Sequence, residues 1–256
     1  MTDIKILPDA VGLARAAAEH FVTLAAGAIA ARERFAVALS GGSTPQALYA
    51  LLATPEFARR VDWPRVYVFW GDERCVSPGH PDSNYRMARE ALLDHVPIPA
   101  DNIHRIRGEI EPTWAADECE RVLQRFFDVP LGGEKRCARF DLVLLGMGED
   151  GHTASLFPGT AALGEQKRWV VAHYVDRLHA WRITLTPVAI NAAANVVFLV
   201  SGLGKAKQLG QVLAGPYQPE VLPAQIVRPT DGRLLWLVDS AAAAHLARPV
   251  TFHTAR

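Results

Sequence analysis

The sequence has no excess of charge of either sign. Its 256 residues include 27 lysines and arginines and 27 aspartates and glutamates, with no basic stripe and no acidic tail. A nucleic-acid or membrane-surface partner is disfavoured, because both need concentrated positive charge. An anionic small molecule would have to be held by a few local cations.

Cysteine is scarce, and long apolar runs are missing. Cys75, Cys119 and Cys137 are odd in number and lack CxxC spacing, so neither a disulfide framework nor a cysteine zinc site is expected. For Cys75, beside a charged loop, an incidental reduced thiol is the favoured interpretation. No HExxH occurs, and the nine histidines form no metal cluster. The apolar run at 24–31 is far shorter than the roughly 20 residues of a membrane helix. We expect a cytoplasmic protein with no membrane partner.

The common nucleotide motifs are absent or unsupported. GxxxxGK[ST] occurs nowhere, so nucleoside triphosphate chemistry has no support. Gly146, Gly148 and Gly151 formally match GxGxxG, but Pro158 follows too soon for the helix that a dinucleotide site needs. GxSxG is also absent, which excludes an α/β-hydrolase nucleophile elbow.

Apolar strand-like runs alternate with helical patterns along the chain. Strands are predicted at 35–40, 66–70, 140–145, 196–200 and 234–238, with a hairpin from 169–175 and 181–185. Helices are predicted at 10–31, 46–52, 84–95, 113–127 and 206–213, with an alanine-rich helix after 238. Strands that are apolar throughout are typical of a sheet covered on both faces. The pattern predicts an α/β fold in which residues 1–256 form one Rossmann-like domain, with a mostly parallel sheet and helices on both faces. A monomer is favoured.

Polar loops follow four of the predicted strands, at 40–45, 71–74, 146–152 and 201–205. Any one of them alone would be read as a tight turn, since glycine supplies positive φ. Loops at the carboxyl edge of a parallel sheet converge, however, so the four together indicate a shared crevice.

The loop after the strand at 140–145 ends in Asp-Gly-His and carries the best candidate for chemistry. His152 can accept and return a proton near neutral pH, and Asp150 can orient its ring. A lone histidine is often structural, but this position after a strand and a glycine turn favours catalysis.

The other loops offer groups that bind anions. The first presents backbone amides where a helix is expected to begin, with Thr44 as N-cap, which suits a phosphate or an oxyanion. Its residues are Gly41, Gly42, Ser43 and Thr44. The Arg74 guanidinium can bind a phosphate through two hydrogen bonds, although residues 72–74 could also be an exposed salt-bridged turn. Lys205 is either an anion contact or a solvated lysine.

Six sequence blocks together resemble the 6-phosphogluconolactonase family. They are ALSGGSTP (38–45), FWGDERCV (69–76), DSNYRMAREALL (82–93), LVLLGMGEDGHTASLFPG (142–159), WRITLTPVAINAA (181–193) and SGLGKAK (201–207). The chain is similar, more weakly, to glucosamine-6-phosphate deaminase. In that enzyme's motif a catalytic glutamate lies five residues after the equivalent of His152, where this chain has Phe157, so the lactonase is favoured.

The resemblance implies hydrolysis of 6-phospho-D-glucono-1,5-lactone in the oxidative pentose phosphate pathway. It implies that His152 activates water, that Asp150 holds the histidine tautomer, and that amides near Gly41 and Gly42 meet the oxyanion. By resemblance the phosphate contacts are Arg74, Arg182 and Lys205, and Asp72 lies in the crevice with its role open. No cofactor or metal is implied, because the ester is already reactive. A sugar-phosphate sensor domain is a less favoured alternative, since the DGH loop is intact.

Overall fold

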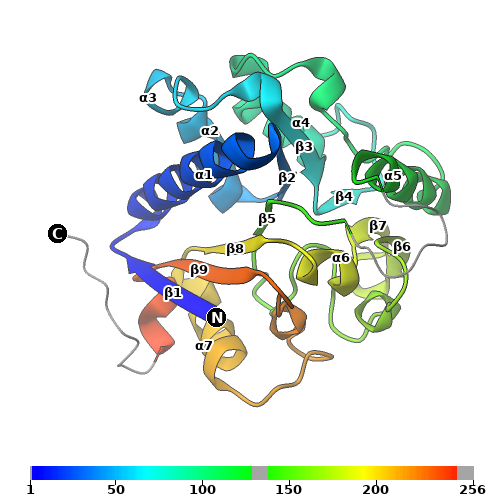
Figure 1. Cartoon of the computed structure of the whole chain (residues 1–256). Helices are drawn as coiled ribbons and strands as arrows, with labels where there is room; N and C mark the ends of the chain where they lie inside the picture. Colours follow the sequence, from blue (N-terminus) through cyan, green and yellow to red (C-terminus); the bar gives the residue numbers. More distant parts are fainter. Residues whose placement is uncertain (1, 129–137, 247–256) are drawn as a thin grey trace.

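The main sheet has six parallel strands. The computed structural model describes residues 2–128 and 138–246, so Cys137 lies outside the described residues. The strand order is β1-β9-β8-β5-β2-β3 (Figure 1). The strands are β1 (Thr2–Leu7), β2 (Phe35–Leu39), β3 (Val66–Trp70), β5 (Leu142–Leu145), β8 (Asn195–Val200) and β9 (Arg233–Asp239).

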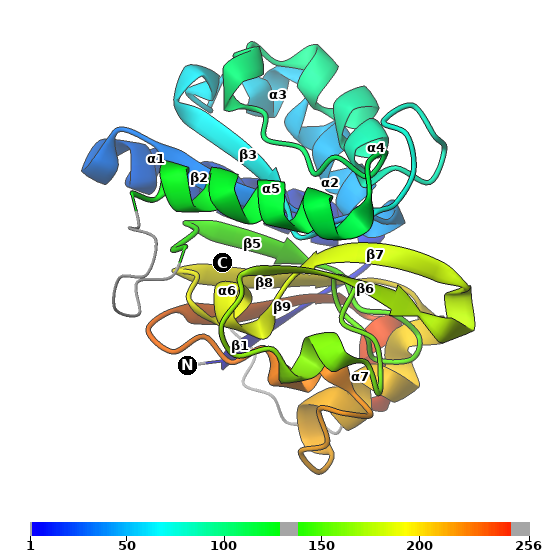
Figure 2. The same ribbon diagram turned by 90° about the vertical axis from the view of Figure 1, so that its right-hand side faces the viewer.

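Helices cover both faces of this sheet, as the apolar strands require. Every residue of β2 and of β5 is buried. Helices α1 (Ala10–Arg32) and α2 (Ser43–Leu52) lie on one face and α5 (Pro112–Phe126) on the other (Figure 2). Phe21 of α1 packs edge-on against Phe35 with ring centroids 5.2 Å apart, and Phe126 of α5 packs on Phe69 at 5.0 Å. The predicted α/β fold with a mostly parallel sheet is confirmed.

A second, antiparallel sheet lies on the same side as α5. Its order is β4 (Asp72–Arg74), β7 (Ala180–Leu185) and β6 (Val170–Val175). The predicted hairpin is therefore present, but the prediction of a loop at 72–74 is wrong. The chain leaves the main sheet at Gly71, whose carbonyl accepts from the Leu185 amide at 2.8 Å, and this contact starts the pairing of β4 with β7.

Three helix predictions need correction. Helix α2 begins at Ser43, and its N-cap is Gly42 rather than Thr44. Helix α4 (Asn84–Ala91) ends earlier than expected because Leu92 leaves helical geometry, with φ −139° and ψ −58°, and a 3₁₀ turn follows. The alanine-rich segment after β9 forms only a 3₁₀ turn at Ala242–His245, as far as the structure describes it.

Some elements were not predicted. Strand β1 pairs with β9 at the sheet edge, and most of its residues are at least partly exposed, so it lacks the apolar run that marks the inner strands. The short helices α3 (Pro55–Ala58) and α6 (Pro187–Asn191) were also not predicted, whereas α7 (Ala206–Ala214) was. No helix in the described ranges is long and apolar enough to cross a membrane.

The strand order reverses between β2 and β5. From β2 the chain moves outward to β3, whereas from β5 it moves the other way, to β8 and then β9. In parallel sheets the carboxyl ends of the strands at such a switch point border a crevice where ligands bind. The loops at 40–45 and 146–152 follow these two strands.

Candidate active site

The turn after β5 brings Asp150 and His152 into direct contact. The carboxylate of Asp150 hydrogen-bonds Nδ1 of the imidazole through Oδ1, and the same oxygen accepts from the His152 backbone amide at 3.1 Å. Burial raises the pKa of Asp150, but the His152 hydrogen bonds and the charges of His152 and Arg177 outweigh it and hold the pKa below its ordinary value. An ionised Asp150 favours the tautomer with the proton on Nδ1, which leaves Nε2 to accept a proton.

Glycine is needed at position 148 for this contact to form. The Gly148 amide donates to the His152 carbonyl at 2.8 Å, so the turn folds back on itself. A Cβ at Gly148 would overlap both the imidazole Nδ1 and the Asp150 carboxylate. Gly151 has a φ of +79°, which glycine adopts without strain.

Phe157 lies against the catalytic candidate. Its ring centroid is 4.2 Å from that of His152, the planes are inclined by 30°, and the residue is 5 % exposed. The Arg177 guanidinium lies 4.7 Å from the centroid of the same phenyl ring. Position 157 therefore presents an apolar wall to the imidazole.

The loop after β2 presents the N-terminus of α2. Its N-cap, Gly42, has a φ of +99° and no side chain that could accept from the first amides of the helix. Open amides at a helix N-terminus attract phosphates and oxyanions. The backbone of Gly41 lies directly against the side chain of Asn84. A Cβ at position 41 would overlap the Asn84 amide, so glycine is needed here.

Asp72 is buried and fully engaged in contacts with the protein. Its Oδ2 accepts from the Ser155 hydroxyl at 2.6 Å, and its carbonyl accepts from the Asn84 side chain at 2.9 Å. Ser155 follows His152 in the chain, and Asn84 lies against Gly41. Asp72 therefore ties the loop after β2 to the segment after the Asp-Gly-His turn.

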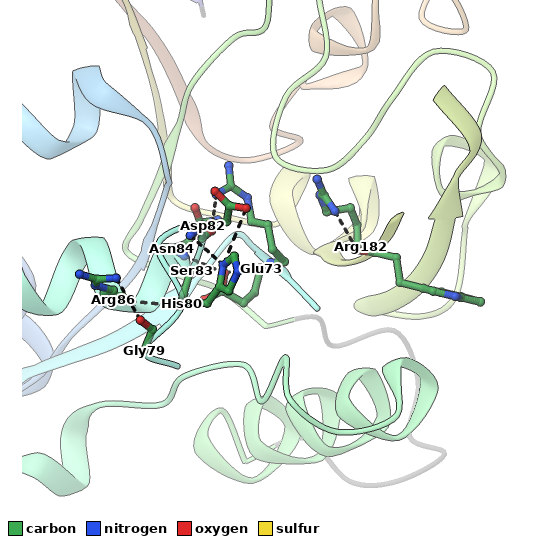
Figure 3. A network of polar contacts seen from close by, with 10 residues as sticks. Glu73, Gly79, His80, Asp82, Ser83, Asn84, Arg86 and Arg182 are labelled. Atoms are coloured by element: carbon green, nitrogen blue, oxygen red, sulfur yellow. Dashed lines mark hydrogen bonds and ion pairs between the residues drawn. The ribbon is translucent and has the colours of Figure 1, made fainter. Parts of the chain in front are cut away.

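Glu73 caps helix α4. Its carboxylate accepts from the backbone amides of Asn84 at 2.7 Å and Tyr85 at 2.8 Å, and from the Ser83 hydroxyl at 3.2 Å (Figure 3). Burial raises the pKa of Glu73 above its ordinary value, although the hydrogen bonds from the backbone amides act in the opposite direction. These contacts give Glu73 a structural role, in which it holds Asn84 in place.

Arg74 and Arg182 face each other across β4 and β7. Their Cα atoms are register partners, and Figure 3 shows Arg182 on the strand opposite the turn that carries Asp82. Arg74 donates to the Asp82 carbonyl at 2.5 Å, and Arg182 to the Trp181 carbonyl at 2.9 Å. Burial and the like charge of Arg74 lower the pKa of Arg182. Within residues 2–128 and 138–246 neither guanidinium forms an ion pair with a carboxylate, so both can take an anion.

Both arginines line a pocket of about 600 Å³ beside the hairpin. Leu178, in the turn between β6 and β7, also lines it, and its neighbour Arg177 pairs with Asp150. His152, the 41–44 loop and Lys205 are not among the lining residues. The structure therefore brings Arg74 and Arg182 together, and the hairpin turn lies between them and the Asp150–His152 pair.

Lys205 lies in the turn after β8. Buried Asp239 shapes that turn by accepting from the Ser201 hydroxyl at 2.5 Å and the Gly202 amide at 3.1 Å. A Cβ at Gly204 would lie 2.7 Å from the Glu149 carboxylate, so this turn touches the Asp-Gly-His turn. In the described part of the chain the Lys205 side chain has no hydrogen-bond or ion-pair partner, which leaves it available for an anion.

Among the described residues no group of three or more His, Cys, Asp or Glu side chains could hold a metal ion. Burial raises the pKa of the Cys75 thiol to about 11, which suits an unreactive thiol. Sequence reasoning missed Arg177, Ser155 and Asn84. Asn84 and Ser155 lie in recognised blocks, whereas Arg177 had no signal beyond its place in the hairpin turn.

Comparisons with known proteins agree with these features. Residues 8–236 match the family described as glucosamine-6-phosphate isomerases/6-phosphogluconolactonase. A 6-phosphogluconolactonase from Nostoc sp. is 44% identical over 245 residues, covering 95% of this chain and 98% of that protein. A 6-phosphogluconolactonase from Synechocystis sp. is 45% identical over 220 residues, covering 86% of this chain and 88% of that protein. The structure of 6-phosphogluconolactonase from Trypanosoma cruzi superposes with a TM-score of 0.84 at 30% identity, covering 97% of this chain and 98% of that one. The chain belongs to the glucosamine-6-phosphate isomerase/6-phosphogluconolactonase family.

Proposed function

We propose that this member of the family hydrolyses 6-phospho-D-glucono-1,5-lactone to 6-phospho-D-gluconate, the lactone step of the oxidative pentose phosphate pathway. Family membership and the names of the relatives support the reaction. The observation that carries the proposal is the Asp150–His152 contact beside the switch point of the parallel sheet, with Phe157 against the imidazole. An imidazole that is hydrogen-bonded to a carboxylate at this edge of the sheet is suited to accept a proton from water.

His152 carries the proton in both halves of the reaction. Its Nε2 takes a proton from a water molecule as the water oxygen attacks C1 of the lactone. The tetrahedral intermediate then collapses, the bond from C1 to the ring oxygen breaks, and the imidazolium gives its proton to that oxygen. Asp150 keeps the ring oriented and stabilises the imidazolium, as in other carboxylate–histidine pairs.

Two sets of groups are assigned to the charges of the substrate. The amides at Gly41 to Thr44, at the start of α2, meet the oxyanion or the phosphate. By family resemblance Arg74, Arg182 and Lys205 are assigned to the phosphate. The two arginines line one pocket and Lys205 lies outside it, and among the described residues none of the three has a carboxylate ion-pair partner that would compete with the phosphate. Binding the remote phosphate positions the carbonyl for attack.

Phe157 argues against the deaminase reaction. The similar deaminase motif carries its ring-opening acid at this position, but here a buried phenyl ring packs on the imidazole. A lactone is already an activated acyl group and needs no such acid. The apolar wall also keeps bulk water from that face of His152.

A substrate comparison tests the proposal. Purified protein is assayed with freshly generated 6-phosphogluconolactone, with unphosphorylated gluconolactone, and with glucosamine 6-phosphate by ammonia release, each corrected for uncatalysed turnover. We expect a much higher kcat/KM for the phosphorylated lactone than for the other two. Comparable rates on both lactones would contradict the phosphate assignment, and ammonia release at similar rates would favour the deaminase.

A further inference from the structure

Arg177 makes two contacts at the candidate active site, although it comes from the other sheet. Its guanidinium forms an ion pair with Oδ2 of Asp150, the oxygen that His152 does not use. The same guanidinium lies 4.7 Å from the centroid of Phe157, the ring that packs on His152. Arg177 thus touches both neighbours of the imidazole.

The hairpin that carries Arg177 is firmly tied to the rest of the fold. Arg177 lies in the 3₁₀ turn Asp176–Leu178, which is closed by His179 in the left-handed region at φ +48°. Strand β6 is held through His173, whose Nε2 is 2.7 Å from the Ser155 carbonyl, and β7 is held by its pairing with β4. The guanidinium is therefore presented from a supported turn.

We propose that Arg177 is a positioning residue that fixes the Asp150 carboxylate, and through it the orientation and tautomer of His152. Holding Oδ2 prevents the carboxylate from rotating, so Oδ1 stays directed at Nδ1 of the imidazole. An arginine suits this task because its guanidinium stays charged at every pH at which Asp150 is ionised, so the ion pair persists. The inference rests on the proposed function for its kinetic test, but its spectroscopic test does not.

The competing role for Arg177 is a direct contact with the substrate phosphate. The two roles differ in the kinetic constant that they affect. Loss of a phosphate contact raises KM, whereas loss of an orienting group lowers kcat because the imidazole is misplaced during the chemical step.

The first experiment replaces Arg177 by methionine, which keeps a long side chain over Phe157 but removes the charge. We expect kcat for the phosphorylated lactone to fall about tenfold with KM little changed, since small misplacements of a catalytic group cost rate. Arg60→Met is the matched control, because Arg60 also pairs with a carboxylate, Glu19, and lies 5.1 Å from the centroid of a phenyl ring, Phe57. Its exposure of 41% is close to the 46% of Arg177. A raised KM with normal kcat in Arg177→Met would overturn the proposal.

A double-mutant cycle tests whether Arg177 acts through Asp150. In an Asp150→Asn background the further change Arg177→Met should alter kcat by less than about twofold, because the coupling partner is already gone. A further tenfold loss in that background would show that Arg177 acts by another route and would refute the inference.

The histidine tautomer gives a readout without substrate. ¹⁵N spectra of imidazole-labelled protein, with the His152 signals assigned by their loss in His152→Asn, should show the Nδ1–H tautomer in the wild type and a mixture of tautomers in Arg177→Met. An unchanged tautomer would contradict the positioning role even if the wild type is an active lactonase. A wild type with no lactonase activity but the expected tautomer shift would refute only the proposed reaction.

Discussion

Gly148→Ala should abolish most activity by displacing His152 without removing any functional group. The added methyl would occupy the space of the imidazole Nδ1 and the Asp150 carboxylate. Relieving the overlap requires a shift of about 1 Å in the imidazole, and a misplacement of that size costs on the order of 10²-fold in rate. We therefore expect kcat for the phosphorylated lactone to fall by about two orders of magnitude, measured at saturating substrate.

Gly146→Ala, in the same turn, is the matched control. A Cβ at Gly146 meets nothing closer than the Ser40 hydroxyl at 3.9 Å, so this variant should keep the wild-type kcat. Thermal unfolding of both variants shows whether either has lost its fold. A folded Gly148→Ala protein with normal turnover would refute the claim that the close Asp150–His152 geometry is needed for the reaction.

Other predictions concern the phosphate contacts and the pH dependence of stability. Lys205→Ala and Arg182→Ala should each raise KM about 10–100-fold, since a charge-assisted hydrogen bond contributes about 1.5–3 kcal/mol. Steady-state measurements of KM and kcat, with Lys207→Ala as control, check this. A variant whose kcat collapses at constant KM would show that its residue acts in the chemical step and not in phosphate binding. The pKa of Asp150 is lowered, so its contribution to stability is present above the ordinary value of 3.8 and lost as pH falls below it. The Tm difference between wild type and Asp150→Asn should therefore narrow in acid, and a gap that stays constant down to pH 3 would contradict this.

The parts of the fold that depend on local pattern could be predicted from the sequence. The inner strands β2, β5 and β8 are continuous apolar runs, and the glycine-rich turns after them mark the carboxyl edge of the sheet. His152 and Asp150 could be proposed as candidates because a strand, a turn and an Asp-Gly-His sequence follow each other directly. Their contact in the structure agrees with the orienting role that the sequence predicts for Asp150.

The parts of the fold that depend on pairing between distant segments could not be predicted from the sequence. Asp72 to Arg74 became a strand because β7 pairs with them, a partner more than a hundred residues away. Arg177 reaches Asp150 because the hairpin folds back over the Asp-Gly-His turn. Its sequence context is that of an ordinary hairpin turn, so only the tertiary fold reveals the contact.

The central claim is that His152 is the proton carrier for lactone hydrolysis, and one measurement tests it most directly. It is kcat of His152→Asn on freshly generated 6-phosphogluconolactone, with circular dichroism of the same sample as the folding control. Asparagine keeps a polar group but cannot take up a proton at neutral pH, so kcat should fall about 10²–10⁴-fold while the fold persists. Near-wild-type turnover by a folded variant would contradict the account and remove His152 from the mechanism.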